Sequence, residues 1–319
     1  MQSAEVSNDR EILATIGTRG SPLALIQANE VRDRLARAHN VGTDRLAIKV
    51  IRTSGDVIQD RPLYEAGGKG LFTKEIELAL LEGAIDIAVH SSKDVPTFLP
   101  DQLWLSAWLP REDPRDVFVS PHAPTLSALA AGRVVGTSSP RRCALVARLR
   151  PDLKLVNLRG NVDTRVRKIE EGQADATILA LAGLKRLGMQ DRATAIFEPD
   201  EFLPAVGQGA IALQSRRGDE RINQFVAAID HKDTETALAA ERSFLALLDG
   251  SCRTPIAGYC KVTADSIDFR GMIISPDGRE AFETSRHGAR GEAVALGADA
   301  ARELRKRAGE KFFTDFSGA

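Results

Sequence analysis

The sequence is poor in cysteine. Its 319 residues include only Cys143, Cys252 and Cys260, and none of them belongs to a CxxC pair. An odd count without such a pair argues against a disulfide framework and against a structural zinc site. The chain is long enough for two or three domains with apolar cores, so each cysteine is by default a small buried hydrophobe.

The sequence also lacks an excess of one charge and any long apolar run. Lys and Arg number 43 against 44 for Asp and Glu, so the formal net charge is −1, and nothing favours nucleic acid as a partner. No run approaches the roughly 18 apolar residues of a membrane span, and the first residues do not resemble a secretion signal. We expect a cytoplasmic protein that binds a small molecule, with no metal, no nucleic acid and no membrane.

What the sequence does contain is an internal repeat. IGTRGSPLAL at 16–25 is similar to VGTSSPRRCAL at 135–145, and LEGAIDIAV at 81–89 is similar to EEGQADATI at 170–178. In each half a strand runs into Gly-Thr, Ser-Pro opens a helix, and a later helix ends at Glu-Gly before another strand. Because strands that alternate with helices favour parallel sheets, the pattern predicts two similar α/β domains with a cleft between them.

The expected elements follow this repeat and then change. The first half should contain strands at 13–16, 46–51 and 85–89 and helices at 23–37 and 72–81. The second half should contain strands at 133–135, 153–156 and 176–181 and helices at 143–150 and 162–171. A strand at 210–214 and a helix at 220–229 could return to an earlier sheet. Beyond them we expect a helix at 234–248 that begins at Asp233 or Thr234, strands at 259–262, 267–274 and 280–286, and a helix at 292–307.

These elements predict an α/β fold with a small C-terminal α+β domain that holds a three-stranded antiparallel sheet. We place domain 1 at 11–109 with 205–229, domain 2 at 110–204 and domain 3 at 230–319. In open α/β sheets ligands bind beyond the carboxyl ends of the strands. That rule directs attention to four segments: 18–21, 90–94, 137–142 and 157–165.

The most informative of these segments is HSSKDVP at 90–96. Lys93 and Asp94 cannot both continue a buried strand, so we expect them at its exposed carboxyl end. A carboxylate there can act as general acid and base or can stabilise a cationic intermediate, although Asp94 could equally cap a turn before Pro96. His90, which has no partner at a metal-ligand spacing, is interpreted as structural.

A second group of residues is cationic. Arg141 and Arg142 follow TSSP, Arg159 and Arg165 lie in NLRGNVDTRVRK, and Arg19 lies in the matching turn of the first half. Cations beside helix N-termini suit a polycarboxylate or phosphate ligand, whereas a solvated helix face is the alternative. GGKG at 67–70 lacks the phosphate-loop pattern, so a flexible loop that carries Lys69 toward the cleft is the better interpretation. Cys252 follows a helix C-terminus, which disfavours a thiolate and suits a thiol that is alkylated once.

Taken together, these stretches resemble the hydroxymethylbilane synthase (porphobilinogen deaminase) family over nearly the whole chain. In this order, the shared stretches TRGSPLAL, RTSGD, GGKGLFTKEIE, DIAVHSSKDVP, REDPRDV, GTSSPRR, LRGNVDTR, LPAVGQGA, ERSFL and GSCRTPIAGY are highly specific. The resemblance implies two domains similar to type II periplasmic binding proteins around a cleft, and a monomeric transferase of tetrapyrrole and heme biosynthesis. It also implies a dipyrromethane cofactor held by a thioether to Cys252. Four porphobilinogen molecules would be added to this primer, with loss of ammonia, and 1-hydroxymethylbilane would be released.

The resemblance also implies roles for individual residues. Asp94 would be catalytic, because each step places positive charge on a pyrrole nitrogen. The cofactor would be bound by Ser91, Lys93, Thr137, Ser138, Ser139, Arg141, Arg142 and Gly160. The substrate would be bound by Arg19, Ser21, Gln27, Arg159, Arg165 and Gln208. Asp56 and Lys69 would belong to a lid loop.

The chain departs from the usual family pattern at Glu65, Ser92, Gln214 and Ser251, and none of these changes removes a catalytic group. Two other functions remain as alternatives: an anion-binding module without catalysis, and a cysteine-dependent hydrolase or transferase with His90 as base. The first leaves Asp94 and Cys252 without a role. The second predicts rapid inactivation by thiol alkylators and no bound chromophore.

Overall fold

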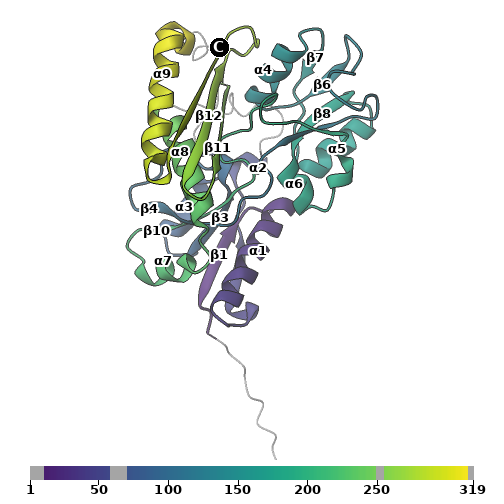
Figure 1. Cartoon of the computed structure of the whole chain (residues 1–319). Helices are drawn as coiled ribbons and strands as arrows, with labels where there is room; N and C mark the ends of the chain where they lie inside the picture. The colour runs from purple at the N-terminus through teal and green to yellow at the C-terminus, as the bar shows by residue number, and fades with distance from the viewer. Residues whose placement is uncertain (1–10, 58–69, 249–254, 315–319) are drawn as a thin grey trace, which may run out of the picture.

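The computed structural model describes residues 11–57, 70–248 and 255–314. They form two five-stranded sheets and one three-stranded sheet. In Figure 1 the first sheet lies at the bottom, the second at the upper right and the third at the upper left. The predicted fold class, two α/β units and a small unit with an antiparallel sheet, is confirmed.

The first sheet has the strand order β2-β1-β3-β10-β4. Its strands are β1 (Ala14–Thr18), β2 (Leu46–Val50), β3 (Ile87–Ser91), β4 (Leu103–Trp108) and β10 (Ile211–Arg216). Its helices are α1 (Pro22–Ala38), α2 (Ser54–Val57), α3 (Lys74–Leu81) and α7 (Glu220–Ala227). The predicted return of the chain is confirmed, because β10 lies between β3 and β4. The expected parallel pairing holds for β1, β2 and β3, whereas β10 runs antiparallel to both of its neighbours, so the sheet is mixed.

The second sheet repeats this plan with the order β7-β6-β8-β5-β9. Its strands are β5 (Asp116–Val119), β6 (Val134–Gly136), β7 (Lys154–Val156), β8 (Ala176–Ala180) and β9 (Ala195–Ile196). Its helices are α4 (Pro140–Leu149), α5 (Val162–Glu170) and α6 (Leu181–Arg186). Sequence reasoning missed β4, β5, β9 and α6. Here too the sheet is mixed, because β8 pairs in parallel with β6 and antiparallel with β5.

The repeat in the sequence corresponds to the same local structure in both halves. Ser21 and Ser139 each cap a helix, α1 and α4, that has proline in its first turn. Asp86 and Asp175 each accept a hydrogen bond from the backbone N–H of the neighbouring strand, at Thr15 (2.8 Å) and Val134 (2.7 Å). The similar turns therefore arise from similar capping interactions.

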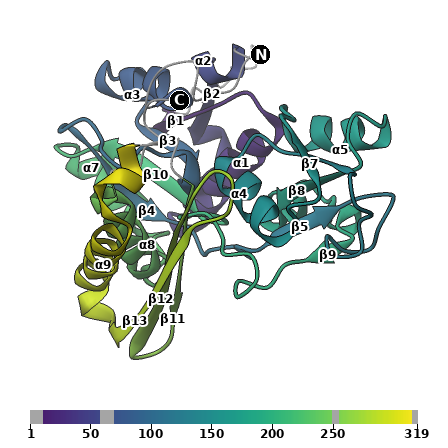
Figure 2. The same ribbon diagram turned by 90° about the horizontal axis from the view of Figure 1, so that it is seen from above.

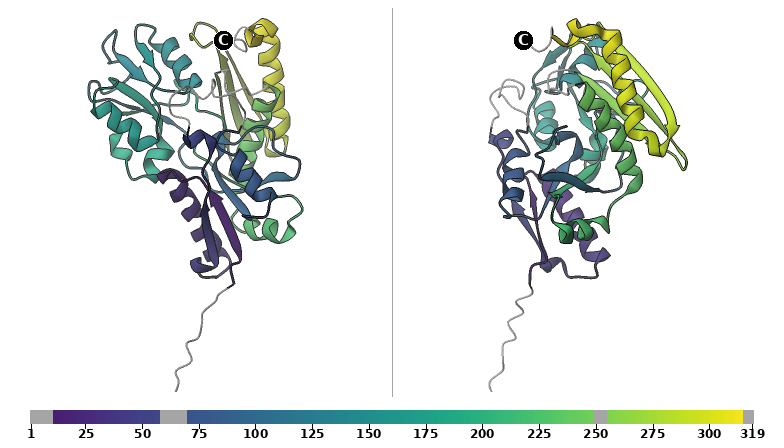
Figure 3. Two further views of the ribbon diagram at one scale, coloured as in Figure 1. Left: turned by 180° about the vertical axis from the view of Figure 1, so that it is seen from behind. Right: turned by 90° about the vertical axis from the view of Figure 1, so that its left-hand side faces the viewer.

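The third sheet consists of β11 (Ile256–Val262), β12 (Ser266–Ile274) and β13 (Ala281–Ala289), all antiparallel. Helices α8 (Lys232–Leu247) and α9 (Ala293–Thr314) pack side by side on its outer face, as Figure 3 shows. Short 3-10 turns occupy Thr43–Arg45, Ser92–Asp94, Gln190–Arg192 and Arg290–Glu292. The predicted start of α8 at Asp233 or Thr234 was wrong: His231 is the cap, and its ring nitrogen accepts from the Thr234 N–H.

The third sheet also joins the three units. Its inner face, with Ala257, Met272 and Ile274, belongs to the same apolar core as the second sheet. The turn between β12 and β13 packs on α4 so closely that a Cβ on Gly278 would lie 2.5 Å from the backbone nitrogen of Arg148. Seen from above in Figure 2, the sheet lies between α9 and α4. The third unit therefore packs directly against the second.

Candidate active site

The carboxyl end of β3 carries the two ionisable residues that the sequence singled out. The strand ends at Ser91 and a 3-10 turn, Ser92–Asp94, follows. The Ser92 N–H donates to the Ala210 carbonyl (2.9 Å), which fixes the turn against the returning segment. Lys93 and Asp94 are exposed while Ser92 is buried. The expected position of both groups at the end of the strand is confirmed.

Asp94 lies on the wall of a small pocket with a volume of about 70 Å³. The pocket brings together five residues named from the sequence: Arg19, Ser21, Gln27, Ser91 and Asp94. Its other lining residues are Leu23, Ala24, Phe72, Thr73, Val89 and His90.

Two contacts order the wall of this pocket. The Arg19 guanidinium lies over the Phe72 ring, 4.1 Å from the ring centroid. Gln27 and Ser91 are hydrogen-bonded side chain to side chain (2.9 Å from Nε2 to Oγ). Phe72 and Thr73 were not predicted to line a site, although they stand in the quoted stretch GGKGLFTKEIE. His90 lies in the expected segment 90–94 but was interpreted as structural.

Lys93 is the second polar group of the strand end. Its ammonium donates to Gln208 Oε1 (3.4 Å), and Gln208 Nε2 in turn donates to the Pro114 carbonyl (2.6 Å). Burial among protein atoms, followed by repulsion from Arg142, lowers the pKa of Lys93 to about 8. The side chain still reaches solvent. It is thus a cation that a bound anion would stabilise.

Cations of the second unit lie within electrostatic range of Asp94. Burial lowers the pKa of Arg165 to about 10, and the charges of Arg142 and Arg159 lower it further, while Asp94 opposes the shift. Arg165 also donates to the Gly160 carbonyl (2.8 Å), and Gly160 has the positive φ of 126°. A Cβ at that position would lie 2.7 Å from the Thr164 side chain, so the turn requires glycine. The structure therefore brings cations from the second sheet and a carboxylate from the first into one electrostatic neighbourhood.

Arg141 and Arg142 lie deeper than the sequence suggested. Helix α4 begins at Pro140, so both are in its first turn rather than in the preceding turn. Each is 5% exposed, and each guanidinium lies 2.7 Å from a different oxygen of Asp116. Asp116 is fully buried, and despite that burial the two arginines hold its pKa below the ordinary value. Sequence reasoning missed Asp116, although it is the last acidic residue of the quoted stretch REDPRDV.

The remaining predicted residues lie around this group or outside the described chain. Thr137 is buried, and its Oγ1 accepts from the Ser139 N–H (3.3 Å), while Ser138 is half-buried between them. Asp56 lies on α2. Cys252, Lys69, Glu65 and Ser251 lie outside the described residues.

A buried ion pair between Arg111 and Glu241 links the connection between the first two units to the third unit. Glu241 of α8 is fully buried and pairs with Arg111. It also accepts from the backbone N–H groups of Gly207 (2.7 Å) and Cys260 (2.8 Å). The Glu241 carboxylate therefore contacts three parts of the chain: the β4–β5 connection at Arg111, the segment before β10 at Gly207, and the third sheet at Cys260. In the described part of the chain no group of His, Cys, Asp and Glu could hold a metal, and no helix there is long and apolar enough to cross a membrane.

Comparison with known proteins identifies the family. Residues 14–224 match the model of the porphobilinogen deaminase dipyrromethane cofactor-binding domain, and residues 236–306 match the model of the porphobilinogen deaminase C-terminal domain. The chain belongs to the porphobilinogen deaminase family. It is therefore a transferase of tetrapyrrole biosynthesis, and its larger matched segment is the family's domain for the dipyrromethane cofactor.

Relatives in the porphobilinogen deaminase family match over nearly the full length. Porphobilinogen deaminase of Nitrobacter winogradskyi is 73% identical over 313 residues, covering 98% of this chain and 99% of the relative. Porphobilinogen deaminase of Nitrobacter hamburgensis is 72% identical over the same shares.

Among solved structures, a periplasmic substrate-binding protein of an ABC transporter from Coxiella burnetii aligns with a TM-score of 0.43 and 15% identity, over 68% of this chain and 91% of that one. The periplasmic VFT2 domain of BvgS from Bordetella pertussis aligns with a TM-score of 0.40 and 18% identity, over 68% and 86%.

The residues present fit the cofactor that characterises the porphobilinogen deaminase family. A dipyrromethane built from porphobilinogen units carries acetate and propionate groups. Lys93 and Arg165 both have lowered pKa values, because burial and then the charge of Arg142 disfavour their charged forms. Carboxylates bound near these side chains would offset that repulsion.

Proposed function

We propose that this chain catalyses the stepwise, deaminating condensation of four porphobilinogen molecules onto a dipyrromethane held by Cys252, and then releases 1-hydroxymethylbilane. The observation that supports this proposal best is the position of Asp94. It is an exposed carboxylate at the end of a central strand, in a pocket with Arg19 and within electrostatic reach of Arg165. A carboxylate surrounded by cations suits a reaction in which an anionic substrate develops positive charge.

The cations have the role of binding. Arg19 on the first unit, with Arg159 and Arg165 on the second, would hold the acetate and propionate groups of the substrate. Lys93, with Thr137, Ser138, Ser139 and Gly160, would hold those of the cofactor. Arg141 and Arg142 are already paired with Asp116, so they would not bind the cofactor carboxylates directly. Two guanidinium groups with one buried carboxylate carry a net positive charge, and its electric field would attract the cofactor carboxylates.

Asp94 has the role of handling protons and charge. When bound through Cys252, the dipyrromethane supplies the pyrrole carbon to which the next ring is joined. Asp94 would stabilise the positive charge that develops on a pyrrole nitrogen as ammonia leaves, and would take up the proton lost after coupling. Ser21, Gln27 and Gln208 would help to bind the incoming ring. Ser91, which is hydrogen-bonded to Gln27, would help to bind the cofactor together with Lys93, which donates to Gln208.

The test combines mass and turnover. We expect the intact mass of the purified protein to exceed its sequence mass by one dipyrromethane, and the Cys252→Ser variant to lack this addition. Asp94→Ala should keep the addition and lose nearly all turnover of porphobilinogen. If the protein stays at its bare sequence mass after incubation with porphobilinogen, the proposed anchor is wrong. Wild-type rates in Asp94→Ala would remove the proposed catalytic role.

We also propose the organisation of the enzyme. The boundaries would be 11–109 with 205–229, 110–204 and 230–319, since each range contains one of the three sheets. The enzyme would act as a monomer in the cytoplasm and would not bind nucleic acid, with Lys69 in a loop over the cleft, whereas Asp56 lies on the short helix α2 and not in a loop as expected. Light scattering at several concentrations tests the monomer, because a mass near twice the 34.5 kDa of the chain would contradict it.

A further inference from the structure

A chain of hydrogen bonds runs from helix α3 to the pocket beside Asp94. Gln214 Nε2 donates to the Glu77 carboxylate of α3 (3.0 Å), and Gln214 Oε1 lies 3.0 Å from His90 Nε2. Gln214 is fully buried and His90 is 5% exposed. In the β3–β10 pairing Gln214 faces Ala88 and Ala212 faces His90, so the two side chains are diagonal neighbours on one face of the sheet.

Glu77 sets the donor and acceptor directions in this series of hydrogen bonds. A carboxylate can only accept, so the Gln214 amide must turn its NH₂ group toward Glu77. Its carbonyl oxygen then faces His90, and an oxygen there requires a proton on His90 Nε2. In a neutral ring the other nitrogen, Nδ1, is left as an acceptor. Glu77 therefore selects the tautomer of His90 through Gln214.

The free nitrogen belongs to a ring that lines the pocket. His90 lines it together with Asp94 and Arg19, and among the described residues the ring makes no second hydrogen bond. Burial lowers the pKa of His90 to about 4; Arg19 adds to the shift, while Asp94 and the bond to Gln214 oppose it. The charged groups that face the ring are thus Arg19 and Asp94, with Glu77 behind Gln214. At neutral pH the ring is uncharged, so Nδ1 keeps a lone pair in a residue that lines the pocket.

We propose that His90 is a substrate-binding residue whose Nδ1 accepts a hydrogen bond from the pyrrole N–H of porphobilinogen, and that Gln214 and Glu77 are positioning residues that hold the required tautomer. This inference rests on the proposed function, since it names a further contact for the same substrate. The pyrrole N–H is the donor that persists at each addition, whereas the amino group departs as ammonia. A neutral acceptor also leaves the handling of positive charge to Asp94.

Two substitutions test the roles of the two ring nitrogens separately. In His90→Gln the side-chain amide reaches the Nε2 position, so it can keep the bond to Gln214 but lacks the acceptor at Nδ1. In His90→Asn the amide oxygen takes the Nδ1 position, so it keeps the acceptor and loses the bond to Gln214. We expect His90→Gln to unfold near the wild-type temperature at pH 7 and to raise KM for porphobilinogen about tenfold, the effect of one lost hydrogen bond. His90→Asn should unfold at a lower temperature with a KM within about twofold of wild type.

A purely structural histidine would give the reverse ranking, with His90→Gln close to wild type in KM. That result would overturn the proposal. The matched controls are His39→Gln and His39→Asn, because His39 likewise makes one hydrogen bond, to the Phe225 carbonyl (2.8 Å), and does not line the pocket. Both should leave KM unchanged. An intact mass with the dipyrromethane in place must accompany each rate, so that loss of the cofactor is not mistaken for loss of a contact.

The donor and the tautomer can be tested separately. An analogue with hydroxymethyl in place of the aminomethyl group keeps the pyrrole N–H, so His90→Gln should weaken its binding by the same factor. A loss confined to porphobilinogen would overturn the assignment to the pyrrole. In ¹⁵N-histidine spectra, with His90 assigned by its absence from the variant, the proton should be on Nε2; a proton on Nδ1 would contradict the proposal without any assay of activity. If wild type itself lacked turnover, the proposed function would fail instead.

Discussion

The two α/β units follow the same path and carry different chemistry at equivalent positions. The first-unit stretch LEGAIDIAV continues as HSSKD, whereas the second-unit stretch EEGQADATI continues as LALAG. The first unit therefore ends its central strand with polar groups, and the second continues from β8 into the apolar helix α6. The opposite holds at the start of the first helix of each unit, where Leu23 and Ala24 of α1 correspond to Arg141 and Arg142 of α4.

One buried residue accounts for the second difference. In the second unit Asp116 of β5 pairs with Ala180 of β8. In the first unit the equivalent antiparallel strand, β10, places Ile211 opposite Ser91. A carboxylate at this position lets two arginines be buried in the first turn of a helix, and an aliphatic residue requires that turn to be apolar. The comparison shows how duplicated units can divide an active site: one provides reacting groups, and the other provides a fixed positive cluster.

The largest effect should follow from removing the carboxylate that distinguishes the second unit. Asp116→Asn leaves two buried guanidinium groups without a counter-charge, and breaking such a pair costs about 3–5 kcal/mol of unfolding free energy. Urea denaturation at pH 7 measures this loss. The control is Asp299→Asn, which removes one of the two carboxylate partners of Arg286 (2.7 Å) at a position that is 59% exposed and should cost less than about 1 kcal/mol. Equal losses in the two variants would show that the buried cluster is not special.

The sequence predicted much of this arrangement because the repeat and the turn residues are local signals. Ser-Pro, Glu-Gly and the apolar run before HSSKD were sufficient to place helix starts and strand ends within a few residues. The partner of Arg141 and Arg142 could not be found in this way, since Asp116 lies on a short strand that was not predicted. Its pairing depends on which strand lies beside β8, and that order is a property of the whole sheet.

The second prediction concerns His90, where the second unit has Leu179. The ring is neutral in the folded protein, with a pKa of about 4, against about 6.5 in the unfolded chain. As the pH falls below 6.5 the unfolded state takes up a proton first, so stability falls until the folded ring titrates near pH 4. The loss is about 3 kcal/mol. In wild type, titration of His90 should lower the unfolding free energy by about 3 kcal/mol between pH 7 and pH 4. His90→Gln should lack this contribution. Parallel curves of unfolding free energy against pH for the two proteins would contradict the prediction.

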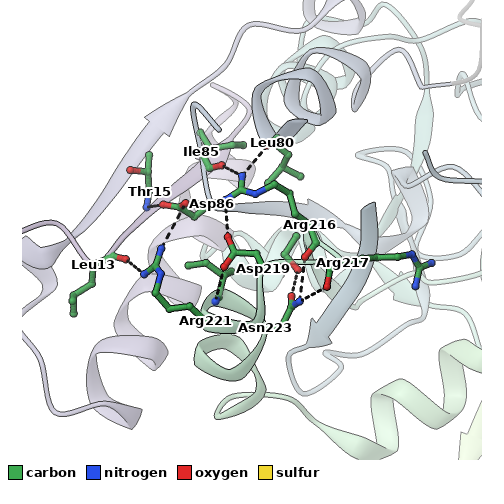
Figure 4. Close-up of polar contacts among 12 residues, drawn as sticks. Leu13, Thr15, Leu80, Ile85, Asp86, Arg216, Arg217, Asp219, Arg221 and Asn223 are labelled. Carbon is green, nitrogen blue, oxygen red and sulfur yellow. Dashed lines mark hydrogen bonds and ion pairs between the residues drawn. The ribbon is translucent and has the colours of Figure 1, made fainter. Parts of the chain in front are cut away.

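The third prediction compares the two aspartates that occupy the same place in the repeat. Figure 4 shows Asp86 in a polar network with Arg216, Asp219 and Arg221. Arg216 is 25% exposed and also donates to the carbonyls of Leu80 and Ile85 (2.8 Å each). This network therefore connects β10 to the end of α3 and to the segment that leads into β3.

Asp175 has more exposed partners, since Arg133 is 46% and His122 is 41% exposed. Asp86→Asn should cost about 2 kcal/mol and Asp175→Asn about 1 kcal/mol, because both keep an amide oxygen for the strand N–H and only the first disturbs a half-buried network. Chemical denaturation of both variants tests the order. A larger loss at Asp175 would mean that the capping of the strand, rather than the network, dominates.

Some features of the site depend on tertiary contacts that no local pattern reveals. His90 was interpreted as structural from the sequence, and its bond to Gln214 agrees with that view. Its place in the wall of the pocket becomes visible only when α1, α3 and β3 are brought together. Likewise, REDPRDV and ERSFL were quoted as separate stretches, and the pairing of Arg111 with Glu241 joins residues that are 130 positions apart.

The smallest effect, of opposite sign, is expected at Ser92, where the second unit has Leu181. Ser92 is 3% exposed, and its hydroxyl has no hydrogen-bond partner among the described residues. Removing an unpaired buried hydroxyl removes a desolvation cost, so Ser92→Ala should stabilise the fold by up to about 1 kcal/mol. The control is Thr177→Val, which removes a buried hydroxyl that does donate, to the Gly136 carbonyl (2.7 Å), and should destabilise by about 1 kcal/mol. If both variants lose stability by denaturation, the Ser92 hydroxyl has a partner after all, and the polar end of β3 extends one residue further into the fold than the described contacts indicate.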